Sequence, residues 1–372
     1  MNRRDFIKRL LRGLEAGMVY SLLPSSVFAA VKNSGTEGPM IENLAEGLGL
    51  REIARKKMHH GKDKFLNPFS DSMHGRMGRL LQWKLFSKNH FRKYYDGEKV
   101  KPVHIDWGPI KKDRGLSITF LKHAGILIKD VDEYLIVDPV FSDLFWFIKD
   151  FTPFALDMDA MPSPNHVLIT HGHYDHLDKS SLAHLDKDTH VISPLGYDDI
   201  FSDLEIKKRT PLDWFQSYSN SGQEITLVPC NHWTMRNPIT GPNTSLWGSY
   251  LIKTASGFTV FVSGDTAYFD RFQEIGRDQK IDLAIFNLGA YEPQWFMAQS
   301  HINPKDTVLA FKELKARHLM IIHWGTFRLG DEPVHFPPIQ IKEELKKEGL
   351  LDHFIDINHG ETLYYSDHVK QI

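Results

Sequence analysis

The segment from Ile169 to Asp178 constrains this chain more than any other, because it places three imidazoles and two carboxylates within ten residues. The run before it, His166 to Thr170, is apolar and β-branched, which is typical of a buried strand. The histidine cluster therefore begins where a strand ends, and α/β proteins build their sites at strand ends. Imidazole nitrogens and carboxylate oxygens at this density favour a divalent cation such as zinc. The alternative is a polar loop with surface histidines.

The composition is that of an ordinary globular protein. The chain has 372 residues, of which 41% are hydrophobic and 25% charged, so it can bury a large core. A formal net charge of -2 indicates no polyanionic partner, and we expect no binding of nucleic acid. The single cysteine, Cys230, excludes an intramolecular disulfide and a cysteine-based zinc site. After the N-terminal region no apolar run reaches the roughly eighteen residues of a membrane span.

The N-terminus resembles an export signal of the twin-arginine type. Residues 2–8 contain paired arginines, then an aromatic, an aliphatic and a lysine, and the small residues near Ala30 suit a signal peptidase. We therefore predict a signal peptide over residues 1–30 and a periplasmic or exported protein. An uncleaved anchor at the inner membrane is the fallback, and a basic amphipathic starting helix is the alternative.

Residues 31–101 are predicted to form a basic N-terminal extension that packs on the main domain. Lysines and arginines outnumber acids there and alternate with aromatic residues. Read as a helix, Leu80 to Phe86 is apolar nearly all round, which favours packing on the protein body. A basic, aromatic surface is also compatible with peripheral contact to anionic lipid headgroups. A solvated face is the equally simple interpretation.

Residues 102–372 alternate short apolar runs with turns and are predicted to form one α/β domain. Pro304 to Ala316 is the clearest helix, because Asn303 can cap it and Pro304 suits its first turn. Consecutive strands in each half, with late helices, indicate two sheets face to face with helices outside. The predicted strands are 116–121, 134–139, 166–170, 190–194, 224–229, 249–253, 258–263, 281–288 and 318–323, with 249–253 and 258–263 forming a hairpin.

Three further ligand-type residues follow predicted strands. His232 comes after an apolar run that ends at Cys230, Asp265 follows Ser263-Gly264, and His323 follows Ile322. Each alone is most often a satisfied loop residue. Together with the opening cluster they indicate one site, because converging strand ends bring distant sequence together.

This ligand order resembles the metallo-β-lactamase superfamily. The resemblance implies an αβ/βα four-layer sandwich with a binuclear metal centre at one edge. Within the superfamily the chain is similar to the branch of phospholipases D that hydrolyse N-acylphosphatidylethanolamine. The motifs cover roughly Pro102 to Phe336 and comprise 123–124, 138–142, 170–178, 231–233, 289–293, 295–297 and 322–327.

The resemblance implies a division of the ligands between two metal ions. A first ion would be held by His171, His173 and His232, a second by Asp175, His176 and His323, and Asp265 would bridge them. Two zinc ions, or manganese as an alternative, would share this carboxylate and a water. That water should ionise near neutral pH, so the metal-bridging hydroxide is the expected nucleophile.

Other residues are predicted to complete the site. The resemblance places His301 at the mouth, where it would bind phosphate or protonate the leaving group; local hydrogen bonding at a helix N-terminus is the alternative. Asp178 is expected to orient a ligand imidazole. His123 either lines the site or is structural. An apolar wall for an acyl chain is predicted from Tyr291, Trp295, Phe296 and Met297.

The predicted function is that of an exported binuclear zinc phosphodiesterase of phospholipase D type, acting on N-acylphosphatidylethanolamine-like phospholipids. The first alternative is a metal-dependent lactonase or other ester hydrolase of the same superfamily. The second is a degenerate binding module, which the full ligand set disfavours. Lactam cleavage is disfavoured because the best-known zinc β-lactamases use a cysteine where this chain has Asp265. The sequence predicts no oligomeric state.

Overall fold

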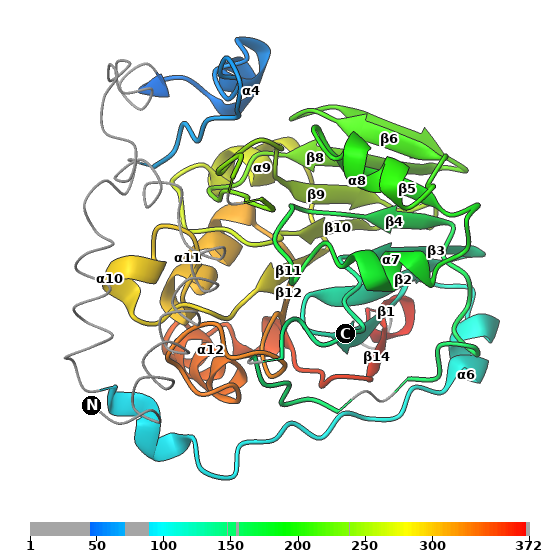
Figure 1. The fold of residues 1–372 in the computed structure, drawn as a ribbon. Helices are drawn as coiled ribbons and strands as arrows, with labels where there is room; N and C mark the ends of the chain where they lie inside the picture. Colours follow the sequence, from blue (N-terminus) through cyan, green and yellow to red (C-terminus); the bar gives the residue numbers. More distant parts are fainter. Residues whose placement is uncertain (1–44, 71–88, 147, 154–155, 238, 370–372) are drawn as a thin grey trace, which may run out of the picture.

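Two sheets dominate the protein. The computed structural model describes residues 45–70, 89–146, 148–153, 156–237 and 239–369, and in these ranges each sheet has seven strands (Figure 1). The first sheet has the order β14 (Thr362–Tyr364), β1 (Ser117–Lys122), β2 (Gly125–Asp130), β3 (Glu133–Val137), β4 (His166–Leu168), β5 (His190–Pro194) and β6 (Arg209–Leu212). The second has the order β13 (Phe354–Ile355), β12 (His318–Ile322), β11 (Leu283–Asn287), β10 (Thr259–Val262), β9 (Ser249–Lys253), β8 (Gln223–Val228) and β7 (Ser217–Asn220).

Both sheets change from antiparallel to parallel pairing at their centre. In the first sheet the pairs from β14 to β3 are antiparallel and those from β3 to β6 are parallel. In the second the pairs from β7 to β10 are antiparallel and those from β10 to β13 are parallel. Parallel strands end at one sheet edge, so the loops that follow them gather there.

Helices cover the outer faces of the two sheets, which gives the four layers that the sequence predicts (Figure 1). On the first sheet lie α7 (Lys179–Ala183) and α8 (Asp198–Asp203), and α6 (Trp107–Lys112) packs in the same layer. The second sheet carries α9 (Phe272–Asp278), α11 (Pro304–Leu314) and α12 (Phe336–Lys347). The remaining elements are α4 (Leu50–Arg55), η2 (His90–Tyr94), α10 (Gln294–Met297), η3 (Leu351–His353) and α13 (Tyr365–His368).

Residue alternation in the first sheet separates two hydrophobic cores. In β3, Leu135 and Val137 face the core between the sheets, whereas Ile136 faces the core beneath the helices. In β2, Leu127 likewise points opposite to its two neighbours. A strand with a period of two and apolar residues on both faces must be covered on both sides, so the first sheet is an inner layer.

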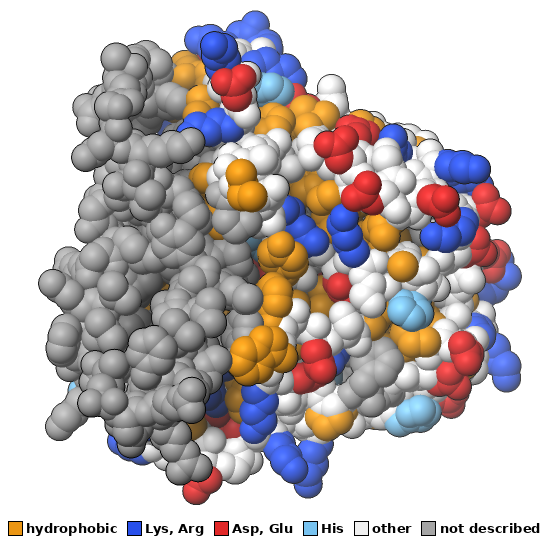
Figure 2. All heavy atoms as spheres, in the orientation of Figure 1, with side chains coloured by type: hydrophobic (Ala, Val, Ile, Leu, Met, Phe, Trp, Pro, Cys, Tyr) orange, Lys and Arg blue, Asp and Glu red, His pale blue; other side chains and the backbone are white. Residues whose placement is uncertain are grey.

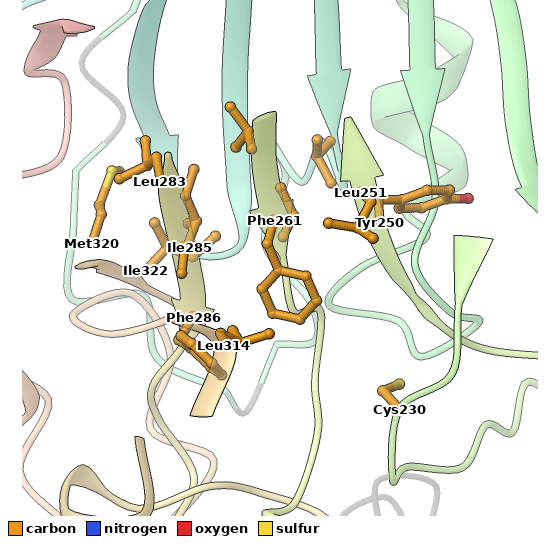
Figure 3. Close-up of a cluster of buried hydrophobic side chains, with 14 of the residues drawn as sticks. Cys230, Tyr250, Leu251, Phe261, Leu283, Ile285, Phe286, Leu314, Met320 and Ile322 are labelled. Carbon is orange, nitrogen blue, oxygen red and sulfur yellow. The ribbon is translucent and has the colours of Figure 1, made fainter. Parts of the chain in front are cut away.

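The second sheet is also buried on both faces. Consecutive residues of β10, Val260 to Val262, all belong to the core, as do Phe311 and Leu314 of α11. Figure 3 shows Phe261, Phe286 and Leu314 within this cluster of buried side chains. Near-continuous apolar runs of this kind are typical of strands covered on both sides.

The structure confirms the predicted fold class and most of the predicted elements. The strands β5 and β9 have their predicted bounds, β9 and β10 form the predicted hairpin, and the Asn303 side chain caps α11 by accepting from the backbone N–H of Asp306. The strands β2, β6, β7, β13 and β14 were not predicted. The signal segment 1–30 and the helix at 80–86 lie outside the described residues, so they stay predictions, as do the predicted domain limits.

The described surface has mixed charge. On the face shown in Figure 2, Lys and Arg side chains are interspersed with Asp and Glu. Among the described residues, no helix has the length and apolar content needed to cross a bilayer.

Candidate metal centre

The strand ends place the seven predicted ligands at one edge of the two sheets. The loop after β4 carries His171, His173, Asp175 and His176 from the first sheet. From the second sheet, His232, Asp265 and His323 follow β8, β10 and β12. All seven side chains are buried. The structure therefore brings these seven residues, distant in the sequence, to one place.

A first ligand group consists of His171, His173 and His232. The Nδ1 atom of His173 lies 2.9 Å from Nε2 of His171 and 3.3 Å from Nε2 of His232. These atoms lie close enough together to bind a single cation. The Nε2 atom of His173 is buried without a hydrogen-bond partner among the described residues. The three nitrogens that converge on one point are Nε2 of His171, Nδ1 of His173 and Nε2 of His232.

A second ligand group consists of Asp175, His176 and His323. The Nε2 atoms of the two histidines are 3.2 Å apart, and Oδ2 of Asp175 lies 3.5 Å and 3.4 Å from them. The other oxygen of Asp175, Oδ1, is buried without a hydrogen-bond partner among the described residues. This arrangement suits a second divalent cation.

Asp265 lies between the two groups. Its Oδ1 is 3.3 Å from Nε2 of both His176 and His323, and its Oδ2 is 4.0 Å from Nε2 of His232. One carboxylate that faces both groups is what a pair of ions about 3.5–4 Å apart requires.

Most of the buried ligands have the protonation state that cation binding requires, and His176 is the exception. Burial opposes protonation of His176, but the neighbouring Asp265 and Asp175 carboxylates outweigh it and raise its pKa well above the usual range, so a cation would have to displace that proton. Burial lowers the pKa of His171 and His232 well below the usual range, and that of His173 to about 3, so these imidazoles are neutral. Burial opposes ionisation of Asp265, but the neighbouring His323 and His176 outweigh it and hold its pKa well below its usual range. Neutral imidazoles and ionised carboxylates are the forms that bind metal.

Several neighbours fix the ligands in place. Asp138 accepts a hydrogen bond from Nδ1 of His176 at 2.7 Å, the carbonyl of Ser300 lies 2.8 Å from Nδ1 of His232, and the Asn287 amide donates to Asp265 at 2.9 Å. Nε2 of His123 lies 3.1 Å from Oδ2 of Asp175, so His123 lines the site. Partners of this kind orient a metal ligand and set its tautomer.

Asp138 is a functional residue that the site prediction missed. It follows β3 as the ligands follow their strands, and it also accepts from the backbone and hydroxyl of Thr170. The only signal in the sequence was its place at a strand end, within the motif 138–142. Asp178, by contrast, is not where the prediction put it. Its carboxylate caps α7 and accepts from Ser142, and Asp138 orients the imidazole instead.

Left-handed backbone conformations cluster around the centre. The φ angles are 52° at His123, 42° at Asp138, 57° at Ala290 and 70° at His323, although none of these residues is glycine. Such conformations cost about 1–3 kcal/mol each and persist where the surroundings determine them. The backbone N–H of His323 donates to the carbonyl of His123 at 2.8 Å, which joins two of these positions.

The histidine-rich loop is clamped by the segment that follows His232. The Arg236 guanidinium donates to the carbonyl of Leu177 at 2.5 Å and lies over the Tyr174 ring at 4.1 Å. The Tyr174 hydroxyl donates back to the carbonyl of Arg236, and Gly172 N–H donates to the Thr234 hydroxyl. The segment that supplies one ligand therefore also holds the loop that supplies four.

His301 and the predicted apolar wall lie beside the centre but differ in exposure. Nδ1 of His301 is 3.6 Å from Oδ2 of Asp265, and its backbone N–H donates to the carbonyl of Met297. Tyr291 and Phe296 are buried inside the fold, and the Tyr291 hydroxyl is bonded to Gln340 of α12. Trp295 and Met297 are half-buried, so only these two of the four predicted wall residues have side chains that reach the surface.

A buried carboxylate supports this wall and should make its stability depend on pH. Both oxygens of Glu332 accept backbone N–H groups, from Tyr291 at 3.3 Å and Glu292 at 3.0 Å, and burial raises its pKa to about 8. The folded state thus binds an extra proton between about pH 4.5 and pH 8, and stability should fall as the pH rises through that window. Glu332→Gln should remove this decline. Thermal unfolding of the metal-free protein checks it; parallel pH profiles for both proteins would contradict it.

The fold and the site together define a metal-dependent hydrolase with two sheets. Residues 133–324 match the Beta-lactamase superfamily domain, and the chain therefore belongs to the metallo-β-lactamase superfamily.

Two curated relatives are phospholipases. The chain is 29% identical to N-acyl-phosphatidylethanolamine-hydrolyzing phospholipase D 1 of Caenorhabditis elegans, over 84% of this chain and 95% of the relative. It is 32% identical to the mitochondrial N-acyl-phosphatidylethanolamine-hydrolyzing phospholipase D of Saccharomyces cerevisiae, over 64% of this chain and 50% of that relative. A possible metal-dependent hydrolase from Veillonella parvula shares the fold, with a TM-score of 0.56, 16% identity, and coverage of 68% of this chain and 100% of that one.

Proposed function

We propose that this protein is a binuclear zinc phosphodiesterase that cleaves N-acylphosphatidylethanolamine-like phospholipids by the phospholipase D reaction. The observation that carries the proposal is the single carboxylate of Asp265 facing two buried ligand groups. Two relatives named for this substrate, one of them matched over 95% of its length, support the choice of lipid.

The residues of the chain divide the work of the reaction. Bound zinc would supply Lewis acidity for the phosphate oxygens and lower the pKa of a water. Asp265, Asp175 and the five ligand imidazoles would bind the cations and set their spacing. Asp138, Asn287 and the Ser300 carbonyl keep the ligand atoms aimed inward. Water adds to phosphorus and the phosphorus–oxygen bond to the amino alcohol breaks, so the products are phosphatidic acid and an N-acylethanolamine.

His301 is proposed to take up the proton that the attacking water releases and to pass it to the leaving oxygen, because burial lowers the pKa of its imidazole and leaves it neutral before the reaction. It is anchored through its backbone to Met297 and its imidazole faces Asp265 at the site. His301→Gln should lower kcat by about 100-fold, the range of a lost general acid, while metal content and KM change little. Steady-state kinetics with metal analysis checks this. A raised KM with unchanged kcat would instead assign His301 to phosphate binding.

The substrate test uses zinc-loaded protein and N-acylphosphatidylethanolamine in mixed micelles. The wild type is expected to release more N-acylethanolamine than the Asp265→Asn variant does. Equal release by the two proteins would contradict the proposed lipid substrate. A panel of lactones and thioesters tests the alternative hydrolases, and substitution of manganese for zinc tests the metal.

Export is proposed from the N-terminal sequence alone. If residues 2–8 act as a twin-arginine signal, changing Arg3 and Arg4 to lysine should leave full-length precursor in the cytoplasm. Fractionation with immunoblotting measures this, and mature protein outside the cytoplasm in the double variant would contradict the proposal.

A further inference from the structure

A short segment before the family domain reaches the metal centre. Residues 57–70, here called the N-terminal strap, precede the matched domain at 133–324. The side-chain amide of Asn67 donates to the backbone carbonyl of His232 at 3.0 Å and to Oδ1 of Asn231 at 2.8 Å. The strap therefore contacts the backbone of a predicted ligand directly.

Asn67 contacts the point where two ligand-bearing segments meet. Asn231 precedes His232, and its backbone pairs with Ala267, two residues after Asp265. The N–H of Asn231 also donates to the Thr266 hydroxyl at 3.1 Å. A group that fixes Asn231 and the His232 carbonyl thus bears on the spacing of the ligands from β8 and β10.

The strap is anchored at its N-terminal end by one buried carboxylate. Asp213 accepts from Nε2 of His59 at 2.6 Å and of His60 at 2.8 Å, and Lys57 forms an ion pair with it. The His59 ring is fully buried and stacks on Trp214 with centroids 4.1 Å apart. Burial opposes ionisation of Asp213, but these hydrogen bonds outweigh it and lower its pKa, so the carboxylate is charged at neutral pH.

This anchor is a hydrogen-bonded cluster rather than a third cation site. Its nitrogen–oxygen distances of 2.6 Å and 2.8 Å are those of hydrogen bonds, whereas the imidazole–carboxylate distances of the second ligand group are 3.4 Å and 3.5 Å. The Lys57 ammonium already provides the positive charge that Asp213 needs. Between anchor and centre, the Phe65 N–H donates to the carbonyl of Asn243 at 2.7 Å.

We propose that the N-terminal strap is a working part of the metal centre, in which Asn67 is a positioning residue for His232 and Asp213 anchors the strap. The inference rests on the proposed metal centre, since it concerns the affinity of that centre for its cations. It adds to the family domain an element from outside that domain.

The test measures zinc affinity by competition with a chromophoric chelator in the wild type, Asn67→Ala and Asp213→Ala. The exposed Lys62→Ala, in the same strap, is the matched control. Asn67→Ala should weaken one class of zinc site by about tenfold, the lower end for loss of a ligand-orienting partner. Its metal-free thermal midpoint should fall, because two buried acceptors lose their donor, and the further rise in midpoint on adding zinc should be smaller than in the wild type. Asp213→Ala should show the same weakening and faster proteolysis within residues 57–70.

Each result bears on the proposal. Wild-type affinity in both variants would overturn it, and so would the loss of a third, separate ion in Asp213→Ala, because the anchor would then be a ligand set. If the wild type itself bound no zinc, the proposed metal centre would fail together with the inference. Wild-type zinc binding with unaffected variants would leave the centre standing and remove only the role of the strap.

Discussion

Asp265→Asn is expected to abolish hydrolysis and to lower affinity for zinc by at least about 100-fold. The carboxylate faces both ligand groups, with one oxygen 3.3 Å from His176 and from His323. An amide removes the charge and one acceptor oxygen, so neither cation keeps its full ligand set. Loss of a residue that merely orients a ligand already costs about 10–100-fold, and this residue would be a ligand itself. Metal analysis after dialysis, with a hydrolysis assay, measures both effects.

The matched control for this prediction is Asp282→Asn. Asp282 is also a buried aspartate, and it directly precedes β11. Its carboxylate accepts from the backbone N–H of Thr259 at the start of β10, whereas Asp265 follows the end of β10. This control should lose some stability and keep its metal. Equal metal content in Asp265→Asn and Asp282→Asn would show that Asp265 is not a ligand.

Gly289→Ala is expected to disable the centre through the backbone. A Cβ atom at this position would lie 2.3 Å from the carbonyl oxygen of His323 and 3.0 Å from its Nδ1. The first contact is closer than real Cβ contacts come and the second is unusually tight, so His323, already in a left-handed conformation, must move. We expect zinc affinity of the second ligand group to fall by about 10–100-fold, as for loss of a positioning partner. Zinc titration of the purified variant measures this.

A second glycine separates this effect from simple overpacking. A Cβ at Gly276 of α9 would also lie 2.3 Å from a backbone carbonyl oxygen, that of Leu314 in α11. Both substitutions should cost about 1–3 kcal/mol of stability. Only Gly289→Ala should lose metal affinity. If Gly276→Ala lost as much, the loss would follow from instability and not from displacement of His323.

The sequence allowed the ligands to be predicted because each signal is local. His232, Asp265 and His323 follow apolar strands, and parallel strands end at one edge, so their convergence follows from topology alone. Asp138 also follows a strand, β3, but in the sequence it stands out only as part of the motif 138–142. Its role depends on a hydrogen bond to His176 that only the folded chain creates.

The errors have equally specific causes. Asp178 was expected to orient a ligand imidazole, but its carboxylate accepts from the backbone N–H groups of Ser180 and Ser181 and so caps the next helix. The contacts of Arg236 with Leu177 and of Asn67 with His232 join segments 59 and 165 residues apart. Both donate to backbone carbonyls, which every residue possesses, so no side-chain pattern marks their partners.

The division of the predicted ligands between the two sheets has a mechanical consequence. The first sheet supplies four of the seven predicted ligands and the second supplies three, so a bound pair of cations would fasten one sheet to the other at their shared edge. Pulling the two sheets apart would then require breaking coordination bonds as well as exposing the core. For each of the two cations, a tenfold rise in free zinc above its dissociation constant should add about 1.4 kcal/mol to that resistance. In a compartment poor in zinc, the protein would lose both this link between the two sheets and its proposed hydrolytic activity.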